Sequence, residues 1–149
     1  MNIKKLQLEQ LSEALRHVVV PSRPRTGWIQ AIRTTLGMTT RQLGERLGVA
    51  QSTVVALEKS EATDRISLHS LRRAAEALDC ELHYVLVPRQ SLKERVEQRA
   101  EYVAHKAVSN VTHTMRLEDQ EPSAAYTSRV TQEEKEKALA GRWGRLWER

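Results

Sequence analysis

Apolar residues recur every three or four positions through most of the chain, which is the spacing of amphipathic helices. On this pattern we expect helices over residues 3–20, 27–36, 40–47, 51–59 and 68–78. Side chains that commonly cap a helix N-terminus precede three of them: Thr26, then Thr39 or Thr40, and Ser67. A basic and extended linker, Pro21–Arg25, separates the first helix from the others. The pattern therefore predicts several short helices packed on one another.

The apolar period changes to two at CELHYVLV, Cys80–Val87, and Pro88 stops the run. Such alternation predicts a β-strand. A single strand cannot satisfy its own backbone groups, and the chain offers no second convincing strand. We therefore expect the same strand of a second copy to pair with it in a homodimer. The pairing residues would be Leu82, His83, Tyr84, Val85 and Leu86.

The last third of the chain reads as a helical extension. Ser91 precedes a long polar helix with a narrow apolar stripe, residues 118–128 are loop-like, and residues 131–140 form a short charged helix. The tail GRWGRLWER places two tryptophans among arginines. It is either a docking segment, because Trp and Arg dominate interface hot spots, or else a frayed terminus or a helix packed on its own domain.

Composition and charge narrow the function classes. Phe is absent and aromatic residues make up 4%, so a core must rest on Leu, Val, Ile and Ala. The single cysteine, Cys80, excludes an intrachain disulfide and a thiolate-rich zinc site. No apolar run reaches membrane-spanning length, and we expect a cytoplasmic, nucleoid-associated protein. The net charge is +5, and the first 80 residues carry 12 Lys/Arg against 8 Asp/Glu, which favours an anionic partner.

The stretch TTRQLGERLGVAQSTVVALEKS, Thr39–Ser60, predicts two short helices joined by a tight turn at Gly48. The second helix opens on polar rather than apolar residues, and this geometry lays one helix in the DNA major groove. Gln can bond adenine through both amide atoms, Ser and Thr can donate or accept, and apolar side chains can touch thymine methyls. The expected base-contacting residues are Gln51, Ser52, Thr53, Val55 and Ala56.

Contacts to the DNA phosphates would position this helix without reading sequence. Helix N-termini and cationic side chains supply them, and we expect them from Thr39, Thr40, Arg41, Lys59, Arg65 and the linker residue Arg25. The competing interpretation is structural, with polar residues that only cap the helix and a linker that is only solvated. Trp28 and Arg33 are interpreted as core packing and surface charge. The predicted partner is double-stranded DNA, and a two-fold dimer predicts a palindromic operator.

Catalytic and metal-binding patterns are not found in the sequence. The chain has no Gly-rich phosphate loop, paired acids or nucleophile–base arrangement, so we do not expect an enzyme. His105 and His113 share a face of the long helix but lack a carboxylate or cysteine at ligand spacing. No cofactor and no metal are expected.

Residues 27–87 resemble a helix-turn-helix domain of the Xre/Cro/C1-repressor type. The resemblance lies in T-x-x-Q-L-G-x-x-L-G-V-x-Q-S-T-V-x-x-L-E-K, Thr39–Lys59. It implies that the polar residues opening the third helix of that domain read bases and that Glu58 has a structural or positioning role. CELHYVLVP is similar to the dimerising strand of antitoxins paired with Hip-type kinases.

The expected fold is an all-α, repressor-like helix-turn-helix bundle with one C-terminal β-strand that pairs across a homodimer. A helical C-terminal extension follows this bundle. The regions expected are residues 1–25, a helix and basic linker; residues 26–88, the DNA-binding domain with its dimerising strand; and residues 89–149, a possible partner-binding extension.

A longer resemblance covers the leading helix, RPRTGWIQAIRTTLGM, the helix-turn-helix and ALDCELHYVLVP. These segments look like the family called mobile mystery protein A, small regulators usually encoded beside a Fic-domain protein. Fic domains commonly transfer AMP from ATP onto target proteins. The resemblance implies a transcriptional autorepressor that is also the antitoxin-like partner of a Fic-domain protein. The alternative is a protein-binding antitoxin that neutralises a Fic AMP-transferase, with DNA binding secondary.

Overall fold

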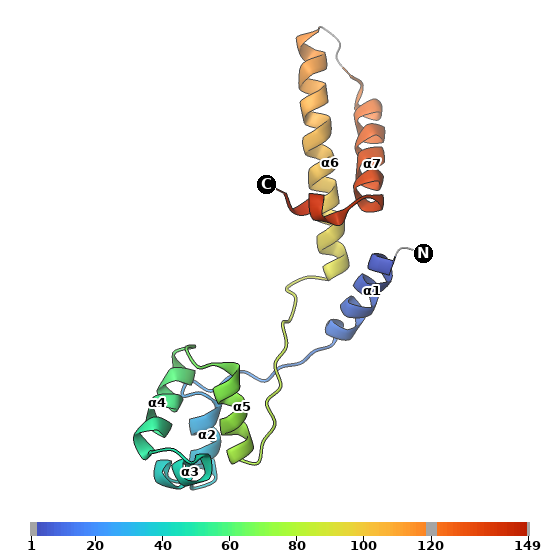
Figure 1. The fold of residues 1–149 in the computed structure, drawn as a ribbon. Coiled ribbons are helices and arrows are strands. Elements are labelled where there is room, and N and C mark those ends of the chain that lie inside the picture. The colour runs from blue at the N-terminus through green and yellow to red at the C-terminus, as the bar shows by residue number, and fades with distance from the viewer. Residues whose placement is uncertain (1–2, 119–121, 149) are drawn as a thin grey trace. The chain divides into compact units, whose positions relative to one another are not determined.

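The computed structural model describes residues 3–118 and 122–148, and all the regular elements in these residues are helices (Figure 1). The prediction of an all-α fold is confirmed, whereas the β-strand predicted beside the helices is not seen. The chain divides into two compact units, Val19–Leu86 and the combination of Met1–Val18 with Val87–Arg149. The elements are α1 (Ile3–Arg16), α2 (Trp28–Thr35), α3 (Thr40–Leu47), α4 (Gln51–Ala62), α5 (Leu68–Ala77), α6 (Leu92–Leu117), α7 (Ala124–Ala140) and the 3₁₀ helix η1 (Trp143–Trp147).

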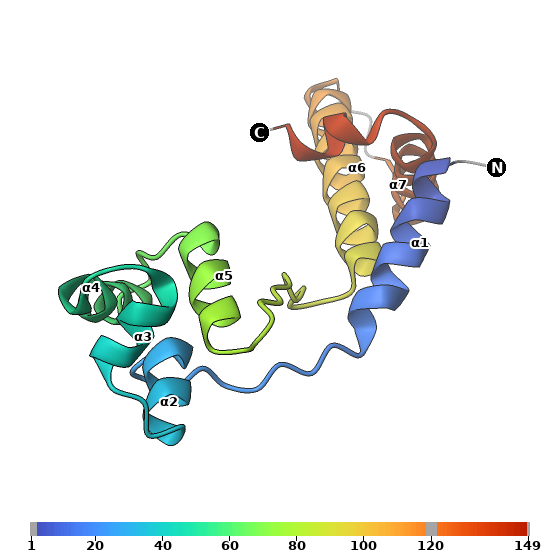
Figure 2. The ribbon, with the colours of Figure 1, turned by 60° about the horizontal axis from the view of Figure 1, so that its bottom comes forward.

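Helices α2, α3, α4 and α5 gather around one small aliphatic core (Figure 2). Its buried members are Ile29, Leu43, Val54, Ala74 and Leu78. The core contains no aromatic side chain, which agrees with a sequence that has no Phe and few other aromatics. Close packing of branched aliphatic side chains lets such short helices approach one another and hold a definite arrangement.

Three of the predicted helix signals are confirmed at atomic detail. The Thr39 side chain accepts a hydrogen bond from the Gln42 amide, and the Gln42 side chain accepts one from the Thr39 amide, which completes a capping box. Gly48 ends α3 in the left-handed conformation with φ of 69°. Ser67 Oγ accepts from the amide of Ser70, 3.1 Å away, at the start of α5. Helix α1 ends at Arg16, earlier than predicted, and α4 continues to Ala62.

The predicted cap of α2 is wrong. Gly27, not Thr26, is the N-cap residue, and no neighbouring side chain caps this helix. The carboxylate of Glu61 does so from α4, because it accepts hydrogen bonds from the amides of Trp28 at 2.7 Å and Ile29 at 2.9 Å. A carboxylate is well suited to the free amides and positive end of a helix N-terminus. The cap therefore also ties α2 to the end of α4.

This tertiary cap makes Gly27 more sensitive to substitution by alanine than Gly37, another glycine with positive φ. Gly27 and Gly37 both have positive φ, so alanine is expected to cost about 1 kcal/mol at either position. A Cβ at Gly27 would also lie 2.7 Å from Cδ of Glu61, whereas nothing lies within 4 Å at Gly37. Moving Glu61 aside breaks the cap, so we expect Gly27→Ala to lose about 1–2 kcal/mol more than Gly37→Ala. Thermal unfolding of the two variants tests this, and equal losses would contradict it.

The second unit is built on the long helix α6. Its buried residues Val96 and Ala100 pack with Leu146 of η1, which is only 1% exposed. Leu8 of α1 and Leu139 of α7 pack against the same cluster. Alanines on α6 permit close approach of the neighbouring helices. In Figure 1, α7 lies beside α6 along much of its length.

The C-terminal tail packs on its own unit. The Trp143 indole Nε1–H donates to the Leu139 carbonyl at 2.8 Å, and Leu146 is buried. Arg99 of α6 donates to the backbone carbonyls of Leu146 and Glu148. Trp143 and Leu146 are therefore packed on their own unit and are not part of a frayed terminus, whereas Trp147 is 49% exposed.

The loop predicted for residues 118–128 is wrong for its last part. Helix α7 begins at Ala124, and Ser123 Oγ accepts from the amide of Tyr126 at 3.2 Å. The Ser-Ala-Ala sequence that looked loop-like supplies a cap followed by strong helix formers. Residues 119–121 of the predicted loop lie outside the described residues.

No strand is present in residues 3–118 or 122–148, so the strand predicted at Cys80–Val87 is not seen in a single chain. Residues 80–88 lie outside any helix, and Tyr84 and Leu86 are exposed. A strand exists only by hydrogen bonding to a neighbour, and no described segment of the same chain pairs with this one. Pairing with a second copy stays a prediction.

None of the described helices is long and apolar enough to cross a membrane. The described residues also contain no group of three or more His, Cys, Asp or Glu side chains placed to hold a metal ion.

Candidate nucleic-acid interface

Helices α3 and α4 are joined by a turn with little freedom. Gly48 takes a left-handed conformation, and the Val49 amide donates to the Gly44 carbonyl at 2.9 Å. The backbone also passes very close here, since a Cβ at Gly44 would lie 2.8 Å from the Val49 carbonyl oxygen. Val54 is fully buried below the turn. These contacts set the angle between the two helices.

The start of α4 presents a polar surface to solvent. All five residues expected to contact bases, Gln51, Ser52, Thr53, Val55 and Ala56, are exposed. Val54 and Glu58 of the same helix are buried and face the unit's interior. The N-cap residue is Ala50, and no side chain caps this helix N-terminus. The polar residues at the helix start are therefore not used as caps.

Gln51 is held in place by the other helix of the pair. Its Nε2 donates to Oγ1 of Thr40, the first residue of α3, at 2.9 Å. An amide NH₂ has a second hydrogen and the carbonyl oxygen keeps its acceptor capacity, so Gln51 can still form two further hydrogen bonds. The contact thus orients Gln51 without using up its bonding groups.

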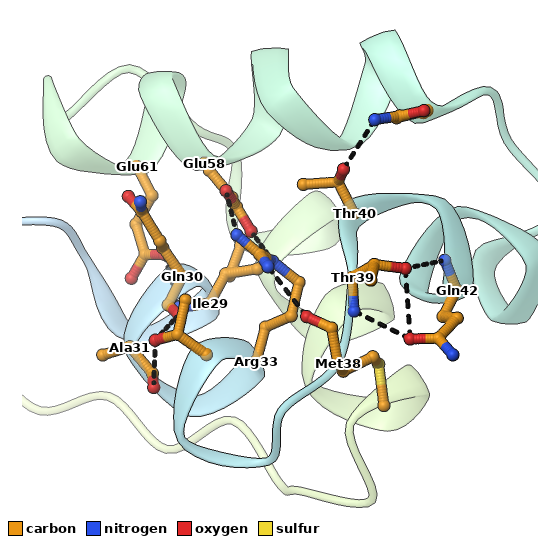
Figure 3. Close-up of polar contacts among 12 residues, drawn as sticks. Ile29, Gln30, Ala31, Arg33, Met38, Thr39, Thr40, Gln42, Glu58 and Glu61 are labelled. Atoms are coloured by element: carbon orange, nitrogen blue, oxygen red, sulfur yellow. Dashed lines mark hydrogen bonds and ion pairs between the residues drawn. The ribbon is translucent and has the colours of Figure 1, made fainter.

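A buried ion pair supports this surface from below. Arg33 of α2 donates from Nε to Oε1 of Glu58 at 2.5 Å and from Nη2 to Oε2 at 3.1 Å. Its Nη1 also donates to the Met38 carbonyl at 2.8 Å, at the turn between α2 and α3 (Figure 3). One guanidinium therefore joins α2, the turn before α3, and α4. The hydrogen bond that Arg33 donates to Glu58, together with the charge of the carboxylate, raises the pKa of Arg33.

The interpretation of Arg33 as a surface charge is wrong, because its residue is only 9% exposed. The resemblance did imply a structural or positioning role for Glu58, and the ion pair gives that residue one. Arg33 and Glu58 are 25 residues apart, so no local pattern joins them. Trp28, interpreted as core packing, is 40% exposed.

The residues expected to contact phosphates fall into two groups. Thr39 and Thr40 lie at the N-terminal end of α3, where Thr40 meets Gln51. Arg41 lies beside them and forms an exposed ion pair with Glu45 at 2.6 Å. Lys59 and Arg65 are exposed near the end of α4 and in the loop after it.

The basic linker is attached to the helix-turn-helix unit by a residue other than the one expected to bind phosphate. Arg23 donates from Nη1 to the Glu61 carbonyl at 3.0 Å and to Oδ1 of Asp64 at 2.6 Å. Arg25 is exposed. Arg23 thus binds the linker to α4 and to the loop after it. This restrains the backbone at Arg25, two residues further along.

Residues 29–85 match the model of a family described as helix-turn-helix. No curated protein and no solved structure matches the chain. Residues 29–85 thus form a helix-turn-helix domain of the Xre/Cro/C1 type, which implies sequence-specific DNA binding. Domains of this kind typically belong to transcriptional regulators that are not enzymes.

Proposed function

We propose that the protein is a transcriptional repressor that binds a palindromic operator as a homodimer and represses its own operon. The observation that carries this proposal is the exposed polar start of α4, where Gln51 is held by Thr40 above the buried Arg33–Glu58 pair. Pre-ordered side chains lose less conformational entropy on binding. This arrangement therefore favours contacts to particular bases over non-specific contacts to DNA.

In the proposed mechanism, α4 lies in the major groove with its N-terminal end against the base edges. Gln51 bonds adenine, and Ser52 and Thr53 bond neighbouring bases or phosphates. Val55 and Ala56, the exposed apolar residues of the same helix, contact thymine methyl groups. The amides of Thr40 and Arg41, which the capping box of α3 leaves without a partner among the described residues, hold a phosphate beside Thr39.

The cationic residues Arg25, Arg41, Lys59 and Arg65 position the domain on the phosphate backbone without reading sequence. Two copies joined through residues 82–86 would place two α4 helices in successive major grooves. Half-sites would then lie one helical turn, about 34–36 Å, apart.

Fluorescence anisotropy on DNA from upstream of the gene and on a scrambled duplex, across a salt series, tests the proposal. Operator-specific binding should exceed binding to the scrambled duplex by about 10³-fold or more. The logarithm of the affinity should fall linearly with the logarithm of salt concentration, with a slope that counts phosphate contacts. Equal and weak binding to both duplexes would contradict the proposal.

Thr40→Val tests whether the contact between the two helices matters for recognition. Valine keeps the shape of threonine but removes the oxygen that accepts from Gln51. We expect operator affinity to fall about 3- to 10-fold, consistent with one net hydrogen bond. Thermal unfolding should change little, and that measurement is the control. Unchanged operator affinity would mean that Gln51 needs no support from Thr40.

We further propose that the C-terminal unit binds a protein partner. The resemblance to mobile mystery protein A suggests that this partner is a Fic-domain protein. An exposed cluster of aromatic and cationic residues on α6 and η1 supports this. The Arg95 guanidinium lies 5.9 Å from the centre of the Trp147 ring, and that of Arg99 lies 4.7 Å from the Tyr102 ring. Trp147 is 49% and Tyr102 55% exposed. Trp, Tyr and Arg are the residues that dominate interface hot spots.

Co-purification with the product of the neighbouring gene, which the resemblance implies is a Fic-domain protein, tests this second function. Trp147→Ala should weaken the complex by about 2 kcal/mol or more, the size typical of a hot spot. Tyr126→Ala is the matched control, because Tyr126 is an exposed aromatic on α7 with Arg129 stacked 5.7 Å from its ring. Equal effects of the two substitutions, or no complex with the unaltered chain, would contradict docking through this cluster.

A further inference from the structure

Two short extended segments, one at each end of the helix-turn-helix unit, expose apolar side chains. The N-terminal extended segment, Val18–Val20, follows α1, and the C-terminal extended segment, Leu82–Leu86, follows α5. Val19 is 91% exposed and Leu86 is 86% exposed. Several neighbouring apolar side chains that are all exposed to water would be stabilised by burial against another surface. This holds for both segments.

The backbone of these segments is also without partners inside the chain. No backbone hydrogen bond joins residues 18–20 or 82–86 to another described residue. Both segments are rich in β-branched or aromatic residues, which favour strands. Both segments therefore have the composition of strands and backbone groups available to pair with another strand.

The dimer of the proposed function supplies two strands of such a sheet, but two strands alone would be unstable. Antiparallel pairing of Leu82–Leu86 with the same segment of a second copy makes a sheet of two strands. A two-stranded sheet is marginal in water, and three or more strands are usually needed for stability. Each strand would also keep one edge with unpaired backbone groups.

We propose that the N-terminal extended segment covers this edge, so that dimerisation forms a four-stranded antiparallel sheet. The order of strands is Val18–Val20, Leu82–Leu86, then Leu82–Leu86 and Val18–Val20 of the second copy. The inference rests on the dimer of the proposed function and adds the segment that completes it. The sheet forms only when two copies meet, because neither pair of strands is stable alone.

Chain direction and proline positions fit this order. The N-terminal segment leads into the unit Val19–Leu86 and the C-terminal segment leads out of it, so antiparallel pairing places the two ends of the unit side by side. Pro21 directly follows the valines, and proline is tolerated on an outer strand where no hydrogen bond is required of it. Pro88 ends the other segment only after Val87, which leaves Leu82–Leu86 free to donate on both edges.

Hydrogen exchange of the unaltered chain of 149 residues tests the inference without any substitution. At concentrations where sedimentation velocity shows a dimer, amides of both segments should exchange slowly, and both should become fast on dilution to the monomer. Slow exchange at residues 82–86 with fast exchange at residues 18–20 would overturn this inference and leave the proposed dimer intact. Fast exchange in both segments of a dimer, or a monomer at all concentrations, would overturn the proposed dimer strand itself.

A pair of variants gives a second measurement. Val19→Lys with Val20→Lys should raise the dimer dissociation constant at least about tenfold, since each copy loses cross-strand apolar pairs. Leu36→Lys is the matched control, because Leu36 is also an exposed aliphatic residue of the unit, at 59%, but belongs to neither segment. An unchanged dissociation constant in the valine variant would overturn the inference.

Discussion

Glu58→Ala is expected to destabilise the helix-turn-helix unit by about 3–5 kcal/mol, the range measured when one partner of a buried ion pair is removed. The side chains of Arg33 and Glu58 are 10% and 8% exposed. Removing Glu58 leaves the guanidinium buried without its carboxylate. Of its hydrogen bonds to described residues, only the one to the Met38 carbonyl remains. Since this guanidinium joins α2, α4 and the turn before α3, DNA binding should fall together with stability.

Urea unfolding of the variant measures this loss, and two comparisons show where it comes from. Glu45→Ala breaks the exposed Arg41–Glu45 pair, whose distance is 2.6 Å, and should cost less than about 1 kcal/mol. The double variant Arg33→Met with Glu58→Leu replaces the buried pair by apolar side chains and should recover much of the stability. Equal losses for Glu58→Ala and Glu45→Ala would contradict a buried structural role.

Gln51→Ala is expected to have the largest effect on recognition with an intact fold. A side chain that bonds a base on two atoms is worth about 1–3 kcal/mol, or about 5- to 150-fold in operator affinity. Gln51 is exposed and its only bond within the described chain is to the Thr40 hydroxyl, so the fold should tolerate alanine. Anisotropy on the operator and on a scrambled duplex should show a loss on the operator and little change on the scrambled DNA.

Lys59→Ala is the matched comparison, because Lys59 is an exposed cation of the same helix. A phosphate contact carries no sequence information, so this variant should weaken binding to both duplexes alike. The slope of log affinity against log salt should fall by about 1. If Gln51→Ala weakened both duplexes equally, Gln51 would be a positioning residue and another residue of α4 would read the bases.

Local signals in the sequence predicted much of the helix-turn-helix correctly. The capping residues Thr39 and Ser67 and the turn residue Gly48 each act within about one helical turn, so their roles follow from neighbours in the chain. The inward-facing apolar residues followed from helical spacing for the same reason. The polar start of α4 is exposed as expected.

Predictions that depended on distant neighbours were less successful. Thr26 is a reasonable cap by local rules, yet the side chain that caps α2 is that of Glu61. Glu61 lies 33 residues after Trp28, whose amide donates to it. Arg33 looked like a surface charge because its partner, Glu58, lies 25 residues away in the sequence. The start of α7 was missed because a capping serine followed by two alanines was taken for a loop.

The sequence by itself determined where most helices begin and end, which faces are apolar, and which polar residues open α4, because these properties depend on contacts within a turn or two of the chain. Only the tertiary structure decided that Glu61 caps α2, that Arg33 and Glu58 join three elements, and that Thr40 holds Gln51. Each of these bonds joins residues that the fold brings together from different helices. Hydrogen-bonding groups select partners by distance in space, and that distance exists only after the helices have packed.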